Sequence, residues 1–295
     1  MSPIPEAARG RLRHVADGRA RGSLESVAGT TGLVLAGFDA MTEVMGCVVI
    51  HLGFATAMCG YWAQGLRTTS RTVLSSTDRL DLVPGGRAVD HAWSTALDRL
   101  LAEARSVGAD GVVGIVPTRR RLPGSSGDEE FVLLGTAVRA RCATRPTAPF
   151  ATDLSGDRVA VLLRSGWVPA GFSIRVSQGI RHDDWATGSA LARWSANTEV
   201  VGLTDLVART RDDARRGLTD RMAALGAEAV VISAISLRTW RQEPGEGHTD
   251  HLAEVTVSGT GLVCFDNTAL GRARAPLTIM PLSGNAGERR GGARR

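Results

Sequence analysis

Four short sequence patterns occur twice in the chain, and their order is the same in both halves. A single three-residue match carries no information, but four matches in one order indicate a tandem duplication. This feature constrains the fold more than any other, because both halves must then adopt the same architecture. The paired segments are Ala36–Phe38 with Ala170–Phe172, His51–Thr56 with His182–Thr187, Gly108–Val113 with Gly226–Val231, and Gly135–Val138 with Gly259–Leu262.

Both halves predict the same succession of elements around one long helix. Apolar residues at spacings of three and four mark the helix, and a glycine that tolerates the left-handed conformation ends it. Runs of Val, Ile, Leu and Phe on either side predict strands. The patterns therefore predict an α+β fold of two units, each a two-layer unit of one antiparallel sheet and one helix.

The expected elements occupy matching places in the two halves. In the first half we expect strands at Leu33–Ala40, up to His51, at Gly111–Arg119 and at Phe131–Arg139, with the helix between Ala92 and Val107 and a loop at Pro123–Glu130. In the second half we expect strands at Trp167–Val176, up to His182, at Ala229–Trp240 and at Leu252–Phe265, with the helix between Ala214 and Leu225 and a loop at Glu243–Asp250.

Composition divides the chain further. Two prolines in a basic and polar stretch predict a linker at residues 141–150, which separates a first unit at residues 31–140 from a second at residues 151–268. A short helix, Asp157–Ser165, introduces the second unit. Residues 1–30 and 269–295 are rich in Gly, Ala and Arg, which predicts two disordered basic tails.

The distribution of charge indicates which partners to expect. All 35 basic side chains are arginine, and the formal net charge is +5. Five arginines stand against three acidic residues in residues 1–30, and six stand against one in residues 271–295, so the body between them is nearly neutral. A nucleic-acid groove needs arginines clustered with aromatic residues on a folded face. We therefore expect no nucleic-acid partner beyond weak contacts of the arginine-rich tails.

Cysteine usage and hydropathy bear on the compartment. Four scattered cysteines without a CxxC pair favour reduced thiols, and the first 30 residues lack the apolar core of a secretory signal. The stretch Val44–Gly60 has the length of a short membrane span. It is rich in Val, Ile and Gly, it has no basic flank, and its counterpart in the second half is charged. We expect a cytoplasmic protein without a membrane span.

Several of the repeated segments resemble the YbjQ-like family, whose members are often labelled as heavy-metal-binding. The resemblance is carried by GADGVVGI (Gly108–Ile115), GAEAVVIS (Gly226–Ser233), the closing GTAV and GTGL strands, and VMGCVVIHLGF before the first helix. It covers about residues 31–265. The resemblance implies a dodecin-like α+β unit that assembles through its sheet edges into a ring, a pentamer for members with one unit.

This chain departs from that family pattern because it carries two units. Exposed strand edges need partners, since an unpaired apolar edge is an aggregation hazard. Two-unit chains cannot fill a five-membered ring evenly. Five chains that form two stacked rings would satisfy the edges, and so would three chains that form one six-unit ring. We expect the partner of this chain to be further copies of itself.

Two pairs of equivalent residues are candidates for a ligand site or an interface. His51 and His182 each end the second strand of their unit, where each could contact a small ligand or be satisfied by a backbone carbonyl. Cys47 would share a strand face with His51, which suits a soft metal. Asp110 and Glu228 follow the helix, where they could meet arginines across a subunit contact or remain solvated.

The densest group of possible metal ligands is His248, Asp250 and His251. Two histidines three residues apart could bind a divalent metal on a helix or tight turn, with Asp250 orienting one imidazole. No further soft ligand stands at the spacing of a structural zinc site. A metal-binding or metal-homeostasis protein is therefore one alternative function.

Motifs of catalysis are missing from the sequence, which has no GxSxG, HExxH, P-loop or phosphate-binding GxGxxG. The sequence favours a non-enzymatic homo-oligomer that serves as a ring or cage component or binds a small ligand. An enzyme whose active site forms only between subunits is the second alternative.

Overall fold

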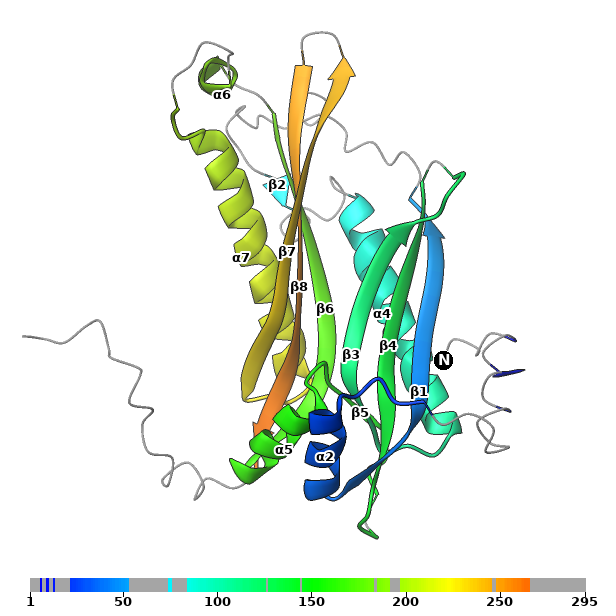
Figure 1. Ribbon diagram of the computed structural model, residues 1–295. Helices are drawn as coiled ribbons and strands as arrows, with labels where there is room; N and C mark the ends of the chain where they lie inside the picture. Colours follow the sequence, from blue (N-terminus) through cyan, green and yellow to red (C-terminus); the bar gives the residue numbers. More distant parts are fainter. Residues whose placement is uncertain are drawn as a thin grey trace, which may run out of the picture.

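The computed structural model describes residues 22–52, 74–75, 84–125, 127–143, 145–182, 185–191, 197–245 and 248–265, together with residues 6, 9, 10 and 13. The described residues form two four-stranded sheets and the helices that cover them (Figure 1). The expected α+β class is confirmed. The first sheet has the order β1-β4-β3-β5 and the second has the order β2-β6-β8-β7.

The first sheet and its helices comprise α2 (Val27–Leu35), β1 (Phe38–His51), α4 (Pro84–Ser106), β3 (Gly111–Arg121), β4 (Asp128–Ala140) and β5 (Phe150–Ala151). The second comprises β2 (Leu74–Ser75), α5 (Gly156–Arg164), β6 (Trp167–His182), α6 (Trp185–Ala190), α7 (Val201–Ala224), β7 (Ala229–Gly245) and β8 (His248–Cys264). A short helix, a long strand, a long helix and a two-stranded hairpin follow one another in both halves. The hairpin's last strand lies at the centre each time, in the orders β1-β4-β3 and β6-β8-β7.

Backbone landmarks give the residue-by-residue correspondence of the two halves. Gly37 and Gly166 precede the first long strand with φ of 81° and 82°, and Gly108 and Gly226 follow the long helix with φ of 69° and 79°. Left-handed φ of this kind favours glycine, which explains the two glycines that the sequence places after the helices. Register shifts recur at the same places in the strands, between Ala40/Thr42 and Pro169/Gly171 and between Val113/Val116 and Ile232/Ala234.

Two of the sequence matches need correction against these landmarks. Gly37 corresponds to Gly166, so the match of Ala36–Phe38 with Ala170–Phe172 does not join equivalent positions. His51 and His182 each end the first long strand of their half, as expected, but β6 is two residues longer than β1. The counterpart of His51 in the register is Ile180, because Asp128 and Leu252 face these two residues from equivalent positions.

Several expected element bounds are also wrong. The strand expected at Leu33–Ala40 begins as helix α2, whose N-cap Ser26 accepts a hydrogen bond from the Gly29 amide at 3.0 Å. The two short strands expected before each long helix are one continuous strand in both halves. In the first half a bulge between Ala40 and Thr42 takes the place of the expected turn, whereas the bulge of the second half, between Pro169 and Gly171, lies inside the first expected strand. The loop expected at Glu243–Asp250 is mostly strand, because β7 extends to Gly245 and β8 begins at His248.

The expected linker is held to the first sheet in its described part. Phe150 and Ala151 pair in parallel with the start of β3, and the Thr152 amide continues the pairing with a hydrogen bond to the Val112 carbonyl at 3.0 Å. The expected linker end at residue 150 therefore lies inside a strand of the first sheet. The helix expected at Asp157–Ser165 is present as α5.

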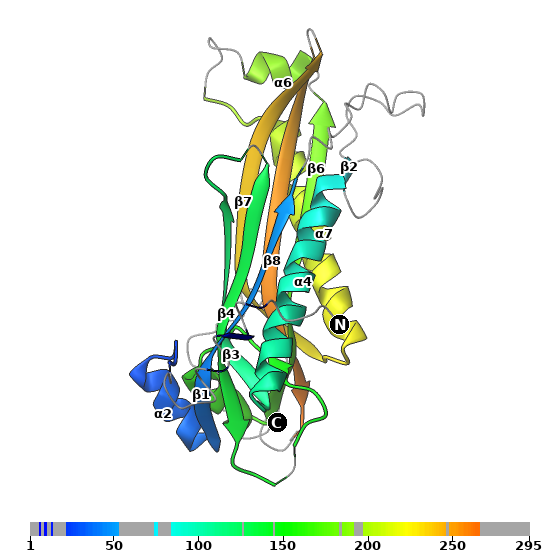
Figure 2. The ribbon, with the colours of Figure 1, turned by 90° about the vertical axis from the view of Figure 1, so that its right-hand side faces the viewer.

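Each long helix covers one face of its own sheet, and the second unit packs onto the first. Figures 1 and 2 show α4 along β1 and β4, and α7 along β6 and β8. The face of the second sheet that points away from α7 packs against α4 and β3. Phe172, Ile174 and Val176 of β6 thereby join the core cluster formed by α4 and the first sheet.

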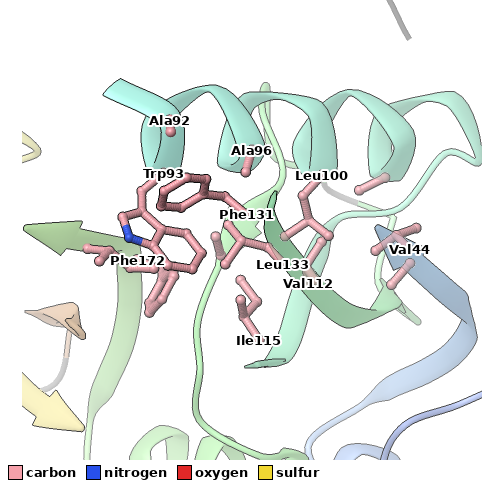
Figure 3. Packing of buried hydrophobic residues seen from close by; sticks show 14 of the residues in the cluster. Val44, Ala92, Trp93, Ala96, Leu100, Val112, Ile115, Phe131, Leu133 and Phe172 are labelled. Atoms are coloured by element: carbon pink, nitrogen blue, oxygen red, sulfur yellow. The ribbon is translucent and has the colours of Figure 1, made fainter. Parts of the chain in front are cut away.

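Trp93 is the centre of this shared core. Its indole meets the Phe131 ring edge-on, with centroids 5.0 Å apart and an interplanar angle of 90°. Figure 3 shows the Phe172 ring beside the same indole. Trp93 is 4% exposed, so it contributes a large buried apolar surface at the junction of the two units.

No helix in the described part of the chain is both long enough and apolar enough to cross a bilayer. The stretch Val44–Gly60 enters the described residues as far as Leu52, and Val44–His51 lies in strand β1. The rest of that stretch lies outside the described residues.

Candidate functional site

The two sheets enclose a cleft with a volume of about 420 Å³. The end of β3 forms one wall, and the open face of β7 and β8 forms the other. Its apolar lining comes from Trp93, Pro117, Ile174 and Ala234, and its charged lining from Arg119, Arg120, Arg121, Glu129, Arg238 and Glu254. Nothing in the sequence pattern predicts this cleft, since it exists only where the two units meet.

Arg119 is the hub of a buried ion network in the cleft. Its guanidinium donates to Glu129 of β4 and, at 2.5 Å, to Glu254 of β8, so one side chain joins both sheets. It also lies over the Phe131 ring, 5.2 Å from the centroid. Glu254 accepts a further hydrogen bond from the Gln178 amide group at 2.7 Å. Both carboxylates are almost fully buried, and their charges are balanced by arginine and hydrogen bonds.

Two more arginines stand at the rim of the cleft. Arg121 lies 3.5 Å from Glu129, and Arg238 lies 3.8 Å from Glu254, with side chains 76% and 50% exposed. The cleft thus carries more guanidinium than carboxylate charge. Among the described residues that line it there is no histidine or cysteine. The guanidinium groups of this lining can bind a small anionic group.

A second ion cluster fixes α4 to the second unit. Asp90 of α4 accepts from Arg175 at 2.6 Å and from Arg221 at 3.3 Å. It also accepts from the Val176 amide, which lies in β6, at 3.3 Å. Asp90 therefore satisfies a backbone donor and two arginines of the second unit at once. Sequence analysis missed this residue, because an aspartate on a helix surface carries no signal of a contact more than 80 positions away.

His51 lies at an exposed strand end and pairs with an aspartate. Its Nδ1 is 2.6 Å from Asp128, which faces it across the β1–β4 register. The Ser125 hydroxyl and, secondly, the His51 ring hold the pKa of Asp128 below its usual value. Cys47 lies four residues before His51 on the same face of β1. Burial raises the pKa of the Cys47 thiol, and a hydrogen bond from the thiol to Glu130 at 3.5 Å adds to the effect.

The second histidine and the predicted metal ligands lie at the corresponding end of the second sheet, where His182 faces Asp250 across the β6–β8 register. The side chains of His182 and His248 are outside the described residues. Asp250 and His251 are buried neighbours on β8, where successive side chains point to opposite faces. These two side chains cannot share one ion within a chain, because a strand has replaced the expected turn. The described residues contain no group of three or more possible metal ligands.

Asp110 and Glu228 occupy equivalent backbone positions but different surroundings. Their amides donate to equivalent carbonyls, those of Val138 and Leu262, each at 2.8 Å. Asp110 is buried and binds Arg145 of the same chain at 2.9 Å, whereas Glu228 is exposed. The arginine contact expected for Asp110 therefore exists inside the chain. A subunit contact through Glu228 stays a prediction.

Comparison with known proteins finds a relative that matches about half of the chain. The chain is 34% identical over 143 residues to an encapsulin nanocompartment protein of Mycobacterium tuberculosis. The match covers 46% of this chain and 48% of that protein, so the chain spans about half the length of the curated relative that it matches. No family model matches the chain, and no solved structure matches it.

Proposed function

We propose that this protein is a non-enzymatic subunit of a homo-oligomeric ring- or shell-like assembly, built from two tandem YbjQ-like units with a dodecin-like fold. The repeated order of elements supports the duplication, and equivalent positions carry the core in both halves. Ala96 and Leu100 of α4 correspond to Ala214 and Leu218 of α7, and all four are buried. The relative's description as a nanocompartment protein supports the assembly.

The observation that carries the proposal is the free edge of β7. This strand has 17 residues and pairs with β8 on one side, while no strand among the described residues pairs with its other side. Val231, Ile235 and Leu237 on it are 37%, 46% and 38% exposed. The equivalent edge of β3 is covered by β5 at its start. A long apolar edge invites pairing or packing with another chain, so proteins rarely leave one uncovered.

Light scattering coupled to size-exclusion chromatography tests this function. At micromolar concentration the particle mass should be several times the chain mass of 31.1 kDa, and electron microscopy should show closed particles. A mass equal to one chain at every concentration would overturn the proposal.

The cleft favours a second candidate function, which is binding of a small anionic ligand within the assembly. Its apolar wall at Trp93 and its rim guanidinium groups at Arg121 and Arg238 suit an aromatic carboxylate. Isothermal titration with benzoate tests this candidate. Heat should be released with the native protein, and the heat should be lost in Arg121→Ser/Arg238→Ser. An unchanged signal in that variant would reject the site.

A further inference from the structure

The contact between the two units inside one chain provides a template for contacts between chains. In each unit the long helix contacts mainly two strands of its sheet and leaves the third largely uncovered, and the surface between the helix and this third strand is called a groove below. The first unit's groove lies between α4 and β3, and it receives the open face of the second sheet. Arg119 in the groove binds Glu254 on that face, and Trp93 packs beside Phe172 (Figure 3).

The chain has a second groove and a second open face that the described residues leave exposed. The second groove lies between α7 and β7, where Ile235 and Leu237 are 46% and 38% exposed. The second open face is the part of the first sheet that points away from α4 and is not covered by α2, α5 and the segment before α2. Val49 of β1 and Val116 of β3 lie on it, and they are 49% and 55% exposed. Each has the same place in its unit as the surfaces buried inside the chain.

We propose that a second copy of this chain occupies the α7–β7 groove. The open face of the second copy's first sheet would dock there, in the same way as the open face of the second sheet packs onto the first unit inside one chain. This inference rests on the proposed function, because it names the surfaces through which the assembly forms. It assigns the groove and the face as the two halves of one head-to-tail interface.

When the second copy is placed as the second unit lies on the first, apolar residues of the two surfaces lie opposite one another. Ile235 and Leu237 stand where Pro117 and Arg119 stand in the first groove. Val132 and Leu134 stand where Thr256 and Ser258 stand on the docked face. Two apolar residues on each side of the proposed contact thus replace Pro117, Arg119, Thr256 and Ser258, of which all but Pro117 are polar. Burial of apolar surface against apolar surface is the main source of affinity in such interfaces.

Charges match in the same frame. Arg211 of α7 corresponds to Trp93 of α4, and Glu43 of β1 corresponds to Phe172 of β6. The buried aromatic contact inside the chain therefore becomes an arginine opposite a glutamate between chains. Glu130, the counterpart of Glu254, faces Leu237 in this frame, and its charge is already balanced by Arg120 of its own chain. Opposite charges at matching positions give the interface its register.

The proposed interface is heterologous, because the two surfaces differ. A heterologous contact repeats from copy to copy, so it forms a ring when the rotation closes and a filament when it does not. If the contact found inside the chain is repeated between chains, every unit contacts its neighbours through the same two surfaces. A chain with two units therefore needs no third kind of contact to build a ring.

Charge reversal tests the pairing of Arg211 with Glu43. Arg211→Glu and Glu43→Arg each place like charges opposite one another, and each should raise the concentration for half-assembly at least about tenfold. The double variant Arg211→Glu/Glu43→Arg should restore assembly. Arg209→Glu is the matched control, because Arg209 lies two residues away on the same helix and pairs with Asp205. Circular dichroism should show that all four variants are folded.

A cysteine cross-link tests the geometry directly. Inside the chain Asp90 reaches the Val176 amide, and the counterparts of these residues are Ala208 and Cys47. Ala208→Cys should form disulfide-linked oligomers with the native Cys47 of the neighbouring copy under mild oxidation, since these positions would come within disulfide reach. Ala208→Cys/Cys47→Ser should lose the cross-linked ladder.

The outcomes separate the two proposals. If the native chain has the mass of one chain at all concentrations, the proposed function fails. If the native chain assembles but charge reversal has no effect and no specific cross-link forms, the head-to-tail docking is overturned while the assembly stands, and the surfaces in contact are others, such as two paired β7 edges. Restoration by the double variant together with the Cys47-dependent cross-link supports the docking.

Discussion

Replacing Arg119 by methionine should destabilise the protein strongly, because it would leave two buried carboxylates without their positively charged partner. The arginine side chain is 14% exposed, and the side chains of Glu129 and Glu254 are 5% and 3% exposed. Removing one partner of a buried ion pair costs about 3–5 kcal/mol, since the remaining charge is left without compensation. Methionine keeps most of the apolar packing of the arginine stem.

The remaining contacts of the two carboxylates place the expected cost at the lower end of that range. Glu129 keeps Arg121 at 3.5 Å, and Glu254 keeps the Gln178 amide group at 2.7 Å. We therefore expect a loss of about 3 kcal/mol in the free energy of unfolding. With a urea dependence of about 3 kcal/mol per molar, the unfolding midpoint should fall by about 1 M. Far-UV circular dichroism in urea measures this shift.

A second substitution checks that the loss of stability comes from the uncompensated buried carboxylates. Adding Glu254→Gln to Arg119→Met removes one of the two uncompensated carboxylates, so the double variant should be more stable than the single variant by at least about 1 kcal/mol. Arg141→Met is the control, because its partner Asp39 is an exposed residue and no measurable change is expected. The reasoning is refuted if Arg119→Met shifts the midpoint no more than Arg141→Met does.

Two further predictions concern a close backbone approach and an aspartate at a strand end. A methyl group at Gly46 would overlap the backbone of α4, so Gly46→Ala should cost about 3 kcal/mol or more in thermal or urea unfolding, whereas Gly188→Ala in α6, where no atom lies near, should be neutral or slightly stabilising. Because the Ser125 hydroxyl and then the His51 ring lower the pKa of Asp128, its stabilising charge should be present above the unfolded-state pKa and be lost as pH falls through the folded-state pKa. Ser125→Ala should raise the Asp128 titration midpoint in an NMR pH series toward the usual aspartate value, and an unchanged midpoint would contradict this assignment.

The periodic parts of the fold could be read from the sequence, because their signal is local. Helical spacing of apolar residues located both long helices, and the glycines after them were confirmed with left-handed φ. The α2 segment failed because VAGTTGLVL has the composition of a strand. Its helical state depends on the Ser26 cap and on close packing of Gly32 against Asp157 at the start of α5. The second of these contacts is tertiary and therefore invisible in a local pattern.

The candidate site could not be found in this way, since its residues come from five strands and one helix of the two units. Arg119 sits in an arginine run whose natural interpretation is a solvated strand end. Only the docking of β8 against β3 buries it between Glu129 and Glu254. The acidic partner lies 135 positions away in the chain. A single sequence contains no signal of such pairings. The sequence therefore predicts a site at the His248–His251 segment, which is rich in possible metal ligands, and does not predict the buried network.

In the proposed tandem arrangement, the contact inside the chain and the contact between chains can carry different residues, which identical single units do not allow. In a ring of identical single units, every groove and every face carries the same residues, so one interface must serve for folding and for assembly. Here the internal contact has a buried ion network and an aromatic core at Arg119 and Trp93. Its proposed external counterpart has Leu237 and Arg211 at those two positions. The internal contact is held by the covalent chain and can afford buried charge, whose benefit is specificity more than stability. The external contact must form between separate molecules, for which apolar burial supplies the affinity and the opposed charges of Arg211 and Glu43 supply the register.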